Sequence, residues 1–270
     1  MPNPLLQLDA IPDFEHMQAS DIEPALKCLI GEAKQAIDQV VQNKESATWN
    51  NTIVPLDESL EKLGRAWGVV SHLNAVRDHP AWRLAYDENL VHISYFYTAL
   101  AQDFRLFERY QFLAQSEGHQ LTDEQQRVIT LALEDFNLAG AQLLPEKREE
   151  LATLSNELSI LESQFSQNVQ DATDAFGLWF NEQQELAGVP ADILASFEQA
   201  AAVRNRSGYF VGLQTPFYLA IMRHARQREL RKKMHYAYVT RASELGDQPQ
   251  WDNTDPVSYT HLTLPTIYSV

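Results

Sequence analysis

Cysteine is almost absent from this chain, since Cys28 is the only one among its 270 residues. A single cysteine cannot close an internal disulfide, so the sequence fits a protein of a reducing compartment. Because Leu26, Leu29 and Ile30 stand beside it, we predict that the thiol is buried and unreactive. The opening Met-Pro-Asn-Pro-Leu-Leu lacks the basic and apolar regions of a secretory signal, and we expect a cytoplasmic protein.

Basic residues are also scarce, because 21 Lys and Arg face 37 Asp and Glu, for a formal net charge of −16 at pH 7. A surface this negative repels phosphate backbones and anionic lipid, so we expect neither nucleic acid nor a membrane as partner. No apolar run approaches the roughly 20 residues of a membrane-spanning helix. One basic cluster has a charge suited to an acidic peptide end, although we interpret it as a solvated helix face. It comprises Arg226, Arg228, Arg231, Lys232 and Lys233.

Two widespread catalytic motifs are missing as well, the glycine-rich phosphate loop and the G-x-S-x-G elbow. What the chain does have is an apolar content of 44%, with only 10 Gly and 12 Pro. That content supports a real core in one large domain or two small ones, and it argues against wholesale disorder.

Apolar residues recur every three or four positions along most of the chain, which predicts a mainly α fold. Ser20 and Glu23 have the spacing of a capping box before a helix that ends near residue 43. Thr122 and Gln125 repeat this spacing before a helix that ends near residue 138. Two further helices are predicted at 55–77 and 81–115.

The clearest periodicity follows Pro145 and forms a heptad seam, which predicts one arm of a long antiparallel hairpin or coiled coil. Asn168 is the only polar residue of the seam, and we interpret it as setting the register, with a substrate contact as the alternative. The seam consists of Leu151, Leu154, Leu158, Leu161, Phe165, Asn168, Ala172 and Ala175.

Two short segments depart from the helical pattern. Residues 176–180 and 209–213 are aromatic or β-branched and fit a small two-stranded ribbon. A helix at about 190–203 is predicted between them, and Thr215-Pro216 starts another.

The last residues differ in character from the rest of the chain. Residues 257–266 read Val-Ser-Tyr-Thr-His-Leu-Thr-Leu-Pro-Thr, without charge or helical period. The string GTC TCT TAT ACA CAT CTG ACG CTG CCG ACG encodes these ten residues and resembles a transposon-end adapter used for sequencing libraries. We therefore interpret 257–270 as a non-native tail, with a natural β-rich tail as the alternative.

An ordered series of segments resembles the thimet oligopeptidase family. Ser-His-Leu-Asn-Ala-Val at 71–76 and Leu-Glu-Asp-Phe-Asn-Leu-Ala-Gly at 133–140 are similar to family segments. The pattern from 154 to 173 is similar to the long helix of the whole family, and 236–243 and 251–253 are similar to the run toward its central region. The resemblance extends over 4–253. Together with the change of character at 257, it leads us to expect three regions. These are an N-terminal helical region at 1–145, a long hairpin with the start of the central region at 146–256, and the tail at 257–270.

The resemblance implies a zinc metalloendopeptidase with a mostly helical fold split by a deep channel, which cuts short peptides and excludes folded proteins. The zinc ligands of the family lie in H-E-x-x-H plus a more distant Glu. Residues four apart share a helix face, so both His can reach one zinc ion while the Glu activates its bound water.

That motif does not occur in this sequence, so we assign no catalytic, cofactor-binding or metal residue. No histidine has another three or four positions away; they are His16, His72, His79, His92, His119, His224, His235 and His261. The implied role of the chain is to shape the substrate channel of a zinc enzyme without binding zinc itself, and it is predicted to be inactive alone.

Two alternatives to this reading stay open. One is a non-catalytic helical protein that binds peptides or a partner. The other is a peptidase site built from scattered residues such as His72, Glu134 and His235, although we interpret His72 as a packing residue.

Overall fold

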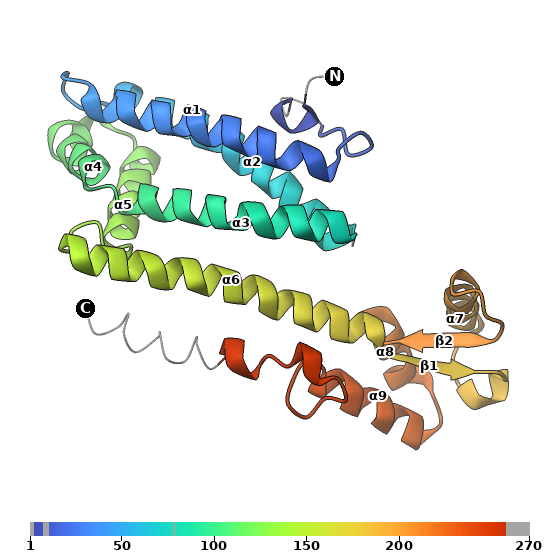
Figure 1. Ribbon diagram of the computed structural model, residues 1–270. Helices are drawn as coiled ribbons and strands as arrows, with labels where there is room; N and C mark the ends of the chain where they lie inside the picture. The colour runs from blue at the N-terminus through green and yellow to red at the C-terminus, as the bar shows by residue number, and fades with distance from the viewer. Residues whose placement is uncertain (1–2, 8–10, 78, 258–270) are drawn as a thin grey trace. The chain divides into compact units, whose positions relative to one another are not determined.

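The computed structural model describes residues 3–7, 11–77 and 79–257 and confirms a mainly α protein with one small ribbon (Figure 1). The helices are α1 Ile22–Gln42, α2 Val54–Val76, α3 Pro80–Ala101, α4 Phe104–Glu117, α5 Asp123–Leu138, α6 Pro145–Ala175, α7 Ala191–Val203, α8 Thr215–His224 and α9 Arg228–Thr240. The strands are β1 Gly177–Phe180 and β2 Tyr209–Gly212. None of the helices described is long and apolar enough to cross a membrane.

The chain divides into two compact units, 1–160 and 161–270. The region boundary predicted from the sequence is at 145, where α6 begins. The division between the units falls inside α6, which runs unbroken through both positions. Within the second unit, residues 254–257 form a helical turn. The rest of the predicted tail, 258–270, lies outside the described residues.

The core of unit 1 lies between α1, α2 and α3, which run side by side in Figure 1. Helix α1 buries one stripe at three- and four-residue steps, as its sequence predicts. Across from it, α2 buries Leu63, Ala66 and Val70, none of which has measurable exposure. The stripe of α1 consists of Ile22, Ala25, Leu26, Leu29, Ala33, Ile37 and Val40.

The structure corrects two predicted boundaries in unit 1. The capping box before α1 joins Gln18 to Asp21, two positions before the predicted pair. The predicted helix at 81–115 is in fact two helices, because α3 ends at Ala101. Asp103 then caps α4, since its side chain accepts a hydrogen bond from the Arg105 amide at 2.9 Å. The cap at Thr122 and Gln125 is confirmed, with both side chains bonded to each other's backbone amide.

Cys28 is exposed, which makes the predicted burial wrong. Leu26, Leu29 and Ile30 are its neighbours in sequence, but position 28 falls outside the buried stripe of α1. The Cys28 Sγ lies 3.5 Å from a carboxylate oxygen of Glu32, and this contact raises the pKa of the thiol.

Tyr110 of α4 packs its ring edge-on against Phe136 at 5.4 Å between centroids. Burial, with a smaller contribution from the Asp57 carboxylate, raises its pKa to about 12. An unfolded tyrosine ionises near pH 10, so the folded state holds this proton more tightly. The contribution of Tyr110 to the free energy of unfolding is therefore fully present below about pH 10 and is lost as pH rises through about 12.

We expect the Tyr110→Phe variant to lose less stability than the parent protein between pH 9 and pH 11.5. Urea unfolding at the two pH values measures this. Tyr95→Phe, at a position 59% exposed, is the control and is expected to follow the parent. Equal losses in Tyr110→Phe and the parent would contradict the assignment.

Unit 2 has its own core around the predicted ribbon, which is confirmed. The strands β1 and β2 pair antiparallel, with Gly177 opposite Gly212 and Phe180 opposite Tyr209. Helix α7, which lies between them in sequence, packs on β2. Phe197 of α7 has no measurable exposure, and its ring meets Phe217 of α8 at 4.8 Å.

The heptad seam of α6 is only partly covered. Most seam residues are half-buried, Phe165 is 41% exposed and only Ala172 is buried. In unit 1 the buried residue of α6 is Asn156, outside the seam, whose side-chain oxygen accepts a hydrogen bond from Ser94 Oγ of α3 at 2.7 Å. The packing of the seam against a second long helix stays a prediction.

Candidate functional site

Two of the scattered residues considered for a catalytic site, His72 and Glu134, belong to unit 1. His72 of α2 is exposed, with its ring 5.9 Å from that of Phe14, and Glu134 of α5 is also exposed. His235 belongs to unit 2, where its Nδ1 lies 3.2 Å from the Tyr218 hydroxyl. In the described part of the chain, no three His, Cys, Asp or Glu side chains gather closely enough to hold a metal ion.

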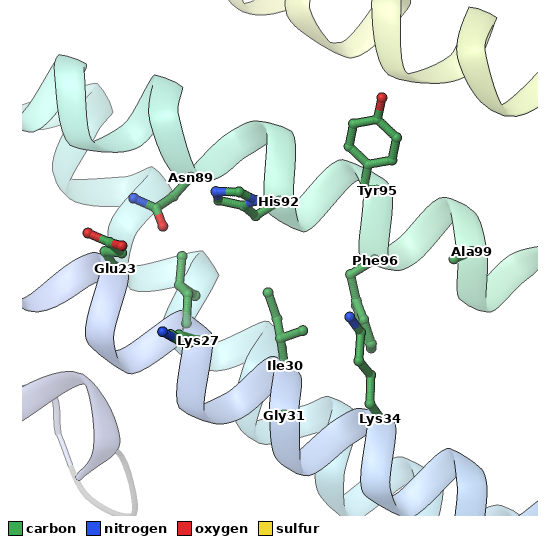
Figure 2. Close-up of a pocket in the computed structure, with 11 residues that line it drawn as sticks. Glu23, Lys27, Ile30, Gly31, Lys34, Asn89, His92, Tyr95, Phe96 and Ala99 are labelled. Atoms are coloured by element: carbon green, nitrogen blue, oxygen red, sulfur yellow. The ribbon is translucent and has the colours of Figure 1, made fainter.

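Unit 1 contains a groove of about 700 Å³ between α1 and α3 (Figure 2). Its floor is apolar and consists of Leu26, Ile30 and Phe96. In Figure 2 the side chains of Ile30 and Phe96 point into the space between the helices, whereas Tyr95 points away from α1. A volume of this size is typical of small-ligand sites.

The α1 rim of this groove carries its charge. Glu23, Lys27, Gly31 and Lys34 follow at steps of four, four and three, so they share one helix face. Glu23 lies toward one end and Lys34 toward the other. Two Lys and one Glu leave one net positive charge in a chain whose total is −16.

The α3 rim supplies polar groups that can form hydrogen bonds. Asn89 is 4% exposed and donates from its side-chain nitrogen to the Ala85 carbonyl at 2.8 Å. His92, one turn further along the helix, is exposed beside the groove. The groove therefore combines an apolar floor, one rim with ammonium groups and one with an amide and an imidazole.

Sequence reasoning missed this groove. The spacing of Lys27, Gly31 and Lys34 is visible in the sequence, but nothing there indicates which helix lies opposite. The predicted basic cluster of unit 2 is largely exposed to solvent. The exception is Arg231, whose guanidinium donates hydrogen bonds to the Arg226 carbonyl at 3.1 Å and to the Ala225 carbonyl at the end of α8.

Asn168 has a specific partner within unit 2. Its side-chain nitrogen donates to the side-chain oxygen of Asn253 at 2.9 Å, and Asn253 in turn donates to the Phe165 carbonyl at 3.2 Å. Asn253 is 4% exposed. The pair ties the segment after α9 to the C-terminal part of α6, which agrees with a structural role for Asn168. Next to it is a cavity of about 470 Å³ that Leu161, Phe165, Pro256 and Val257 help to line.

Comparison with known proteins finds that this helical chain is similar to part of several proteins named as peptidases. Residues 26–148 match the model of the N-terminal domain of neurolysin and thimet oligopeptidase. Oligopeptidase A of Haemophilus influenzae is 38% identical over 256 residues, which cover 94% of this chain and 37% of that protein. Oligopeptidase A of Salmonella typhimurium is 34% identical over 266 residues, 98% of this chain and 39% of that protein.

A plant protein, the probable cytosolic oligopeptidase A of Arabidopsis thaliana, is 31% identical over 260 residues, 93% of this chain and 36% of that protein. The chain belongs to the thimet oligopeptidase family and carries the N-terminal domain of that family. It spans less than two fifths of the length of these relatives.

Proposed function

We propose that this chain is the N-terminal part of a zinc metalloendopeptidase similar to oligopeptidase A, which hydrolyses short peptides in the cytoplasm. The observation that carries the proposal is the similarity to proteins named oligopeptidase A, which extends along 94% of the chain or more in the two bacterial relatives. The contribution of this chain is to form one wall of the substrate channel, where its helices restrict substrate length and help to hold the peptide.

Zinc, when bound in such an enzyme, polarises the scissile carbonyl and activates a water molecule. The described residues do not fit a zinc site, because they offer no cluster of three ligands. In our proposal, zinc binding and the chemical step belong to the part of an oligopeptidase A-like protein that this chain does not cover. In the complete protein the seam of α6, still half-exposed at Phe165, packs against another helix to form the predicted hairpin.

The purified chain is expected to be inactive on a quenched oligopeptide, both with added zinc and after a chelator. Fluorescence release measures turnover, and Escherichia coli oligopeptidase A, 34% identical over 256 residues, serves as the positive control. Chelator-sensitive turnover by this chain would show that it contains its own metal site. An H-E-x-x-H encoded downstream of the Asn253 codon in the native locus would support the assignment of zinc to another part of the protein.

The second candidate function is a non-catalytic helical protein that binds peptides or a partner. The groove between α1 and α3 is the observation that favours it, because it offers a ligand-sized volume lined by both apolar and polar side chains. A native locus that encodes no metal motif downstream, together with tight peptide binding by this chain, would favour this candidate over the first.

A further inference from the structure

Gly31 stands in the middle of α1, where glycine is unfavourable for a helix. Packing within the described residues does not explain it, because a Cβ at Gly31 would meet no atom within 4 Å. The open space above Gly31 is the groove itself, between Lys27 and Lys34 on the same helix face. The missing side chain thus lets a ligand approach the backbone of α1.

The two lysines that flank Gly31 have no acidic partner in the described residues. None of the ion pairs found there includes Lys27 or Lys34. Lys27 and Lys34 lie seven positions apart in the helix, which corresponds to about 10 Å along the axis. A ligand with two anionic groups about 10 Å apart can reach both ammonium groups from within the groove.

We propose that the groove between α1 and α3 binds a short peptide that carries an acidic side chain three residues before a free C-terminal carboxylate. Three residues of extended chain span about 10 Å, which matches the separation of Lys27 and Lys34. An apolar side chain between the two anionic groups enters the floor formed by Leu26, Ile30 and Phe96. Glu23 closes one end of the groove and disfavours further negative charge there. This inference rests on the proposed peptide-handling function and adds a preference for acidic peptides.

The test compares two five-residue peptides by chemical-shift titration of the ¹⁵N-labelled chain, following the amides of residues 26–34 at low salt. The first peptide is Ala-Glu-Leu-Ala-Ala with a free carboxylate, and the second has Gln in place of Glu and an amidated C-terminus. Because exposed ion pairs contribute little each, the acidic peptide is expected to bind roughly three- to tenfold more tightly. Half-molar salt should remove the difference, since it screens exposed charges.

Three variants, each compared with a control substitution, locate the site. Lys27→Gln and Lys34→Gln are expected to reduce the preference for the acidic peptide, and their control is Lys62→Gln on α2, outside the groove. Gly31→Leu fills the groove and is expected to weaken both peptides at least tenfold. Its control is Gly68→Leu on α2, where a Cβ would also meet nothing within 4 Å, and this control should bind as the parent does.

Equal affinity for the two peptides, with both weakened by Gly31→Leu, would overturn the acidic preference while leaving peptide binding in the groove. If Gly31→Leu does not weaken binding, or if neither peptide binds, the proposal that the groove is a peptide site is wrong. The peptidase proposal is tested by the turnover assay and by the sequence of the native locus. A failure of that proposal is therefore distinguishable from a failure of the groove proposal.

Discussion

Replacing Phe197 with alanine is expected to lower the free energy of unfolding of unit 2 by about 3–5 kcal/mol. Phe197 has no measurable exposure and belongs to the buried core cluster that joins α7, β2, α8 and α9. The substitution removes the aromatic contact with Phe217 and leaves a cavity that close-packed neighbours refill only in part.

Urea unfolding followed by tryptophan fluorescence measures this loss. Trp179, which lies in the ribbon of unit 2, reports on that unit. Val203→Ala is the matched control, because Val203 belongs to the same helix and is 74% exposed. The control is expected to change stability by less than about 0.5 kcal/mol. A loss below about 1 kcal/mol in Phe197→Ala would show that unit 2 lacks the packed core described above.

Replacing Asn253 with alanine is expected to cost about 2–4 kcal/mol, because it removes two hydrogen bonds and leaves a polar partner unsatisfied. The partners are the side chain of Asn168 and the carbonyl of Phe165, both on α6. Asn253 also holds the following turn through its backbone, since its carbonyl accepts the Val257 amide at 3.0 Å. The side chain of Asn253 therefore links the segment after α9 to α6.

A double-mutant cycle separates the pair from its surroundings. We expect Asn168→Ala and Asn253→Ala to be coupled by roughly 0.5–3 kcal/mol in urea unfolding. Asn181→Ala, at an exposed position of the same unit, controls for the loss of an asparagine as such. Strictly additive effects of the two substitutions would mean that the Asn168–Asn253 hydrogen bond does not stabilise unit 2.

The helices of unit 1 show how far periodicity predicts the structure. The apolar residues of α1 identify its buried stripe in advance, because a helix repeats its faces every 3.6 residues whatever it packs against. The break between α3 and α4 was not predicted, since Gln102 and Asp103 are neither proline nor glycine. Asp103 ends the helical run by capping α4. The residue three positions later is Leu106, so this cap lacks the capping-box spacing that identifies Thr122 and Gln125 in the sequence.

Burial along α6 shows where periodicity fails. Its heptad pattern predicts a buried Phe165 and does not include Asn156, yet Phe165 is 41% exposed and Asn156 is 5% exposed. Asn156 is buried because Ser94 of α3 lies against it. A heptad describes the face that a helix can bury, whereas the neighbour that is present decides which face it does bury.

The sequence by itself determined the helical class, the ribbon, the main helical stripes and, through an ordered series of short segments, membership of a peptidase family. These features depend on residues close together in the chain, so local spacing records them. Only the tertiary structure decided that Lys27, Gly31 and Lys34 face Asn89 and Phe96 across a groove, and that Asn168 bonds to Asn253. The physical reason is that the groove and the Asn168–Asn253 hydrogen bond each form where two separate segments meet. The partners are dozens of residues apart in the chain, and the spacing of residues within one segment does not encode which other segment packs against it.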